Sequence, residues 1–448
     1  MTESAASTSR EQLPTGPTLA LTVVILLVGF GDGIAYRIRD MMGVASPWLF
    51  LFPLLIGSLV LYWTFGGRSL QPGYFLGALL CVGFMMIGLM LNLFLHGEVY
   101  VVGYLQLTLF VTMLIVVQGV FADAPQWLAG AFPRALAFAH YFLCGYVLLA
   151  FASWHLLGSD LSIPNLMVPQ APGLDIGGLI ESRPFRPSGF SVEPAWAAMA
   201  LAASYTGVHC LMPAERDRAF LALAVAAVAL QSPTLVLFAS VVAVVYTARG
   251  RESFARAGIV VLAAVAMVFL MYSARERLVD IFTGLDPSAL MRLSSTSVAW
   301  HVIEDSFPLG VGYGNFRHFA EYGPEWSNYI SLAEAQYYKS DSLFLNYAAE
   351  LGIWGVALLL FICWNFTRGK HPLPAVFAVM LLALSGTLLM PSVFVMAAIV
   401  GLLQRRKCDE CSRQVAPWEV QPPGVPLGWR VLSLTGGGGV SSVVAKVC

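Results

Sequence analysis

The chain has 448 residues, of which 58% are hydrophobic and only 11% charged, with a mean hydropathy of +0.74. Apolar runs of membrane-spanning length recur from residue 18 to residue 403, which excludes an ordinary soluble domain. The formal net charge of -1 provides no overall field for binding nucleic acid or an anionic lipid surface, so function must depend on local clusters of charge. We predict an all-α, polytopic membrane protein.

Residues 1–17 are polar and rich in Ser and Thr. We expect them to be a retained cytoplasmic tail, because further spans rather than a small-residue cleavage site follow the first apolar run. These runs predict about 12 transmembrane helices within a domain of residues 18–403. In chain order the runs are 18–35, 47–66, 73–95, 100–122, 134–157, 191–212, 219–231, 233–248, 257–273, 342–366, 373–388 and 391–403.

Positive residues set the expected topology. Arginines flank the stretch 219–248 on both sides, so both of its ends belong in the cytoplasm and an even number of passes must separate them. This predicts a turn at Gln231–Thr234, and the same reasoning predicts a turn at Thr387–Pro391. Both termini are then cytoplasmic, and residues 158–190 and 274–341 form two outer segments, of which the second is a large loop.

The last 45 residues, 404–448, are expected to form a disordered cytoplasmic tail, since the glycine run 436–439 and the nearby prolines carry little core-forming pattern. Cys408 and Cys411 make one isolated CxxC motif, which is weak support for a zinc site. We predict no metal and no cofactor.

The first outer segment ends in a cluster of charge, Ser182-Arg-Pro-Phe-Arg-Pro-Ser-Gly-Phe-Ser-Val-Glu-Pro194. Ser191 is expected to cap the following helix, Glu193 to complement its dipole, and Pro194 to lie in its first turn. Arg183 and Arg186 could simply extend to lipid headgroups. Two guanidinium groups beside a helix N-terminus instead favour binding of a phosphate or diphosphate.

The second outer segment holds two more constellations. Arg292 precedes Trp300 and a glycine-rich stretch, Gly310 to Gly314, which we expect to be a tight structural turn because no βαβ unit or GK[ST] motif accompanies it. Further on, Asp341 stands just before the span 342–366, where either it or Ser340 could cap the helix instead of acting in catalysis.

Together these three stretches resemble the O-antigen ligase and polymerase superfamily of bacterial envelope glycosyltransferases, over about residues 180–360. The elements that carry the resemblance are Arg186-Pro-Ser-Gly189 with Glu193-Pro194, then Gln231-Ser-Pro-Thr234, then Arg292 with Trp300 and Pro308-Leu-Gly-Val-Gly312. The resemblance implies metal-independent, inverting transfer of a glycan from a polyprenyl diphosphate carrier to a sugar hydroxyl at the periplasmic face.

The residues suit that chemistry. Arg183, Arg186 and Arg292 are candidates for binding the diphosphate and stabilising the charge that develops on it. A base must accept the proton of the attacking hydroxyl, and Asp341 and Glu193 are candidates, with His301 a weaker one. The expected partners are the polyprenyl-diphosphate-linked oligosaccharide donor and acceptor, membrane lipid, and chain-length regulator and export proteins.

One departure favours a polymerase of exopolysaccharide or O-antigen repeat units. Ligases of the superfamily carry a His-Asn pair where this chain has Asp341-Ser342, and tend to have Ser-Arg where it has Ser232-Pro233. The alternatives are an O-antigen ligase acting on a lipid or protein acceptor, a transporter or flippase for a lipid-linked glycan, and a non-catalytic assembly subunit. We expect the bacterial inner membrane as the location.

Overall fold

The computed structural model describes most of the helical chain. The described residues are 16–35, 38, 72–97, 99–159, 161–162, 187–191, 194–248, 279, 287–322, 340, 342–368, 371–384, 390–414, 429–436 and 439–446. The predicted spans 47–66 and 257–273 lie outside them.

The described chain is helical up to residue 414, which confirms the predicted helical fold. The helices are α1 (Gly16–Val24), continued by the π-helix η1 (Ile25–Gly29), α4 (Pro72–His96), α5 (Val101–Ala122), α6 (Gln126–Leu157), α9 (Pro194–Leu211), η2 (Pro213–Glu215), α10 (Arg216–Leu230), α11 (Pro233–Ala248), α14 (Pro287–Ser306), η3 (Phe316–Tyr322), α16 (Leu343–Leu351), α17 (Ile353–Thr367), α18 (Pro372–Leu384) and α19 (Ser392–Gln414).

Three helices, α4, α5 and α6, are long and apolar enough to cross a bilayer. Four described stretches are shorter apolar helices, among them α17 and parts of α11 and α18. The chain is therefore a membrane protein, and the total of about 12 spans stays a prediction.

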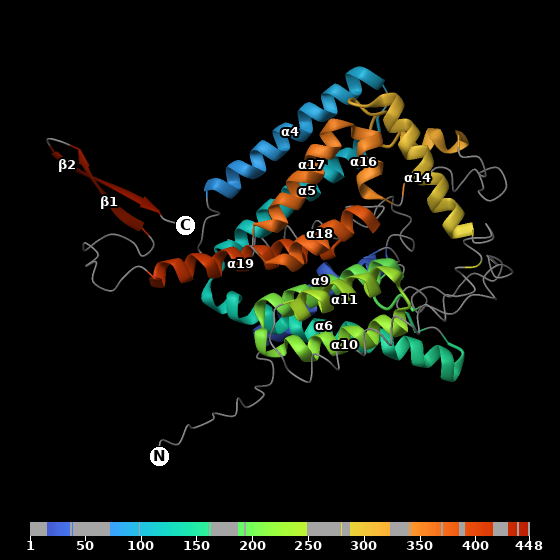
Figure 1. The fold of residues 1–448 in the computed structure, drawn as a ribbon, viewed down its shortest axis with the longest axis horizontal. Helices are drawn as coiled ribbons and strands as arrows, with labels where there is room; N and C mark the ends of the chain where they lie inside the picture. The colour runs from blue at the N-terminus through green and yellow to red at the C-terminus, as the bar shows by residue number, and fades with distance from the viewer. Residues whose placement is uncertain are drawn as a thin grey trace, which may run out of the picture.

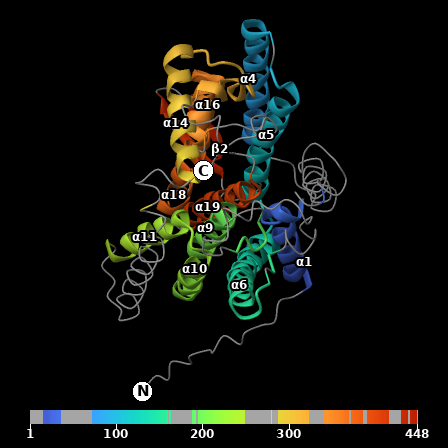
Figure 2. The same cartoon turned by 90° about the vertical axis from the view of Figure 1, so that its right-hand side faces the viewer.

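The helices are arranged around α9 and α19. Figure 2 shows α4, α5, α14 and α16 on one side of this pair and α1, α6 and α10 on the other. In α9 every residue from Ala197 to Leu211 is buried, and most are small. Small side chains let neighbouring helices approach closely in a membrane, which explains why α9 packs against α6, α10, α11, α18 and α19.

The turn predicted at Gln231–Thr234 is confirmed. α10 ends at Leu230, Gln231 adopts a left-handed conformation with φ 48°, and α11 begins at Pro233. A proline at the first helical position is favourable because its missing N–H would have no partner there. α18 and α19 are likewise separate helices, so the expected break before Pro391 is also present.

The single span predicted over 342–366 is wrong. The chain breaks at Gly352, between α16 and α17, where the backbone has φ 58° and ψ -134°. A Cβ at this position would lie 2.1 Å from the carbonyl oxygen of Pro308, so only glycine fits. The break is a tertiary effect, since Pro308 belongs to a loop distant in sequence.

The C-terminal tail also differs from the predicted disorder. α19 continues past residue 403 to Gln414, and its Arg406 donates a hydrogen bond to the carbonyl of Leu211 at 2.9 Å. Beyond it β1 (Trp429–Gly436) pairs antiparallel with β2 (Gly439–Lys446), with Gly436 opposite Gly439. This two-stranded hairpin is separate from the helices in Figure 1.

Candidate active site

The backbone that follows Arg186 forms a buried turn. Pro187, Ser188 and Gly189 are buried, and the N–H of Ser191 donates to the carbonyl of Ser188 at 3.0 Å. The N–H of Ser188 donates to the hydroxyl oxygen of Ser162 at 3.1 Å. These bonds hold the chain in one path immediately after the candidate arginine.

Asp32 and Gly33, just beyond the end of η1, hold the same turn from the other side. The N–H of Gly33 donates to the carbonyl of Phe190 at 3.1 Å. The hydroxyl of Ser191 donates to the carboxylate Oδ1 of Asp32 at 3.1 Å, and both side chains are buried. The ring of Phe190 packs edge-on against Tyr146 of α6, with ring centroids 4.9 Å apart.

Two predictions about the start of α9 have different outcomes. The helix begins at Pro194, as expected. The prediction that Ser191 caps it is not supported, because the Ser191 hydroxyl is directed to Asp32, which sequence analysis did not identify. A signal was present: Asp32 is the one carboxylate in its apolar run, and glycines flank it on both sides.

Arg292 lies in the first half of α14, a helix that packs beside α16. Val298, Ala299 and Val302 of α14 form a small buried cluster with Ala349 of α16. The far ends of the two helices meet through the glycine-rich loop, where the N–H of Gly312 donates to the carbonyl of Glu350 at 2.9 Å. The two helices therefore run in the same direction, and their beginnings lie at the same end of the pair.

Helix geometry then gives the distance of Arg292 from the joined ends, compared with that of the start of α16. At about 1.5 Å per residue, the start of α16 at Ser342 lies roughly 14 Å from the joined ends, and Arg292 roughly 21 Å. Measured along the helices, the backbone of Arg292 therefore lies further from the joined ends than Ser342 does.

The glycine-rich loop is a structural turn, as predicted. Gly310, Gly312 and Gly314 have φ values of 76°, 94° and 83°, and the loop contacts His96 and Tyr100 at the junction of α4 and α5. Burial raises the pKa of the loop residue Tyr313 above its usual range, and the negative charge of Glu350 adds to the effect. The loop connects α14 and α16 to the long spans.

The helix cap of α16 is Ser342, and not Asp341 or Ser340, which the sequence had left as alternatives to a catalytic role. The side chain of Ser342 accepts a hydrogen bond from the N–H of Leu345. Ser340 is fully buried and accepts from the N–H of Ser342 at 3.3 Å.

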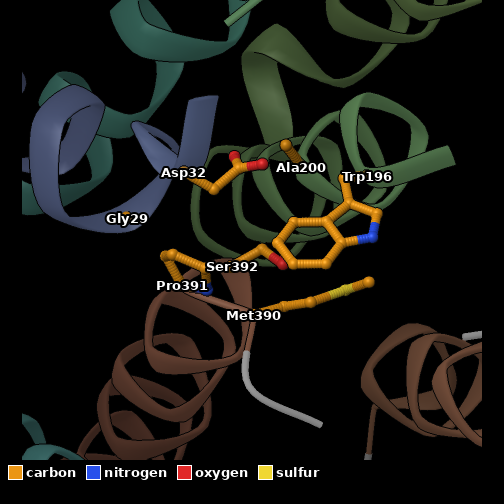
Figure 3. Close-up of a pocket in the computed structure, with 7 residues that line it drawn as sticks. All are labelled: Gly29, Asp32, Trp196, Ala200, Met390, Pro391 and Ser392. Atoms are coloured by element: carbon orange, nitrogen blue, oxygen red, sulfur yellow. The ribbon is translucent and has the colours of Figure 1, made fainter. Parts of the chain in front are cut away.

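A chain of contacts joins the beginnings of α16 and α9. The hydroxyl of Ser342 donates to the carbonyl of Leu382 near the end of α18. Further along the chain, Met390, Pro391 and Ser392 form one wall of a small pocket whose other wall is made by Gly29, Asp32, Trp196 and Ala200. Figure 3 shows the Asp32 carboxylate pointing toward α9 in this pocket, between the first helix and Trp196.

The structure describes only some of the candidate site residues. Arg183, Arg186, Glu193 and Asp341 lie outside the described residues, and Arg292 is described by its backbone. His301 is well exposed on α14 and lies 3.5 Å from Glu304. Within the described ranges, no three His, Cys, Asp or Glu side chains gather closely enough to hold a metal ion.

Comparison with known families decides the relationship. A family model described as O-antigen ligase matches residues 219–360, about a third of the chain. This match supports the resemblance to the O-antigen ligase and polymerase superfamily. The O-antigen ligase match contains the turn at Gln231, Arg292, the glycine-rich loop and Asp341, and it begins after Arg186. No curated protein matches the chain.

Proposed function

We propose that this protein is a glycosyltransferase of the bacterial inner membrane that polymerises oligosaccharide repeat units linked to polyprenyl diphosphate, at the periplasmic face. The observation that supports the proposal is the packing of α14, which contains Arg292, beside α16, which begins just after Asp341 in the sequence, within the O-antigen ligase match. A basic and an acidic group at one site are what this transfer needs.

The arginines would act on the leaving group. When the bond between the anomeric carbon and the diphosphate oxygen breaks, the electron pair and negative charge stay on the diphosphate. Guanidinium groups of Arg186 and Arg292, with Arg183 nearby, would bind this charge without a metal ion. Their planar forks match phosphate oxygens better than a point charge does.

A carboxylate would act on the acceptor. Attack by the acceptor hydroxyl forms a new bond to the anomeric carbon with inversion, and the hydroxyl proton passes to a base. Asp341 is the first choice, because Ser342 already supplies the cap of α16. Glu193, directly before α9, is better explained as a residue that complements the helix dipole.

Polymerisation is preferred over ligation because this chain has Asp341-Ser342 where ligases of the superfamily carry a His-Asn pair. The partners would be the lipid-linked donor and acceptor, together with membrane lipid, and chain-length regulator and export proteins are further candidates. The product formed from the lipid-linked donor distinguishes a polymerase from a ligase, a transporter or an assembly subunit.

The test supplies purified protein in detergent with polyprenyl-diphosphate repeat units and separates the products on a gel. A ladder of increasing chain length supports the polymerase. A single addition that requires a separate lipid or protein acceptor would instead show a ligase. Bound donor that stays unreacted would contradict both enzymes and favour a transporter or an assembly subunit.

A further inference from the structure

The buried carboxylate of Asp32 has no part in the proposed reaction, yet it lies where the first helix meets the turn after Arg186. It is 4% exposed and accepts a hydrogen bond from Ser191, which is 1% exposed. A buried carboxylate is costly unless its partners are well placed, so its presence at this junction needs a reason.

We propose that Asp32 is a positioning residue that holds the Pro187–Ser191 turn in place through its hydrogen bond to Ser191, and so supports diphosphate binding by the arginine that precedes the turn in the sequence. This inference rests on the proposed function of Arg186. In this role Asp32 acts on the arginine through its contact with Ser191.

The local geometry supports a fixed attachment. The N–H of Gly33, adjacent to Asp32, donates to the carbonyl of Phe190 at 3.1 Å, so two successive residues of each segment are joined. A Cβ on Gly33 would lie 2.4 Å from that carbonyl oxygen, which shows how closely the two backbones approach. Phe190 lies four residues after Arg186 in the sequence, and the intervening residues Pro187 to Gly189 are buried.

The opposite face of the turn is held in a similar way. Ser162 accepts from the N–H of Ser188, and Val147 of α6 would lie 3.1 Å from a Cβ on Gly189. The turn is thus held between α6 and the first helix. Of these contacts, the one from Ser191 to Asp32 is made by two side chains and can be removed without changing the backbone.

The experiment measures binding of farnesyl diphosphate, a short polyprenyl diphosphate, to the full-length protein in detergent by titration calorimetry. Asp32→Ala and Ser191→Ala should each weaken binding about tenfold, and the double variant should be no weaker than Asp32→Ala alone, because both remove the same contact. Asp32→Asn should bind nearly as well as the wild type, since an amide oxygen still accepts from Ser191.

A matched control lies in α1, upstream of Asp32. Thr22 is buried and its hydroxyl donates to the carbonyl of Thr18 at 2.8 Å, away from the turn. Thr22→Ala should bind farnesyl diphosphate as the wild type does. If it weakens binding as much as Asp32→Ala, the effect is general packing and the positioning role is wrong.

The two proposals fail differently. If Arg186→Ala weakens binding while Asp32→Ala and Ser191→Ala do not, the diphosphate site stands and the role of Asp32 is overturned. If Arg186→Ala itself binds normally, the proposed site falls and this inference with it. Should Asp32→Ala not fold, Ser191→Ala alone decides.

Discussion

The N–H of Ile353 donates a hydrogen bond to the carbonyl oxygen of Pro308 at 2.9 Å. This hydrogen bond joins the start of α17 to the loop that follows α14. Gly352, the residue before Ile353, lies against the same Pro308 carbonyl. The loop and the break between α16 and α17 therefore depend on one another.

Replacing Gly352 by Ala tests this dependence. The new Cβ would meet the Pro308 carbonyl at 2.1 Å, in a backbone conformation that favours glycine. We expect a loss of stability of about 2–4 kcal/mol, measured by thermal unfolding in detergent. Gly145→Ala in α6 is the control, because a Cβ there meets nothing within 4 Å. Equal stability of the two variants would contradict the packing described for this loop.

Substitutions of Ser342 and Asp341 should have different effects, the first on stability and the second on the rate of polymerisation. Ser342→Ala removes the cap of α16 and should cost about 1 kcal/mol in unfolding free energy. Asp341→Asn should leave stability unchanged and reduce the rate of polymerisation by about 100-fold or more, because the amide cannot accept the proton. The reverse pattern, an unstable but active Asp341→Asn, would make Asp341 a structural residue.

Arg186→Lys and Arg292→Lys should both impair the reaction. Lysine keeps the positive charge but loses the bidentate fork, so we expect a rate about 10- to 100-fold lower, measured as initial ladder formation. Arg317→Lys, on the exposed 3₁₀ helix η3, is the control and should be unaffected. Full activity of both lysine variants would mean that charge alone suffices.

Stability should fall at high pH in a way that depends on Tyr313. Burial raises its pKa in the folded state, so the unfolded chain loses this proton first as the pH rises through about 10. The folded state then binds more protons than the unfolded state, and the unfolding free energy decreases. Tyr313→Phe should lessen the drop in melting temperature between about pH 8 and about pH 11. An unchanged drop would contradict the burial of this hydroxyl.

The local features of the fold could be predicted from sequence. Gln231-Ser-Pro marked the turn between α10 and α11, because a residue that tolerates a left-handed conformation precedes a proline suited to a helix start. Pro194 marked the start of α9 for the same reason. The glycine-rich turn was recognised by what it lacked, a surrounding βαβ unit.

Features that depend on contacts between residues far apart in the sequence could not be predicted from the sequence. The break at Gly352 needs Pro308 to approach it, and the hydropathy of residues 342–366 is continuous across the break. The hydrogen bond from Ser191 to Asp32 joins residues 159 positions apart, so the local pattern favoured a helix cap instead. α19 runs past its apolar end because a helix can continue into charged sequence once a span is complete.

The central claim is that Arg186 stabilises the diphosphate leaving group during polymerisation. Its most direct test compares the initial rate of ladder formation for Arg186→Ala and Arg317→Ala, with thermal unfolding confirming that both are folded. The account predicts a loss of at least about 100-fold for Arg186→Ala and a wild-type rate for Arg317→Ala. A folded Arg186→Ala protein that builds the ladder at the wild-type rate would contradict it.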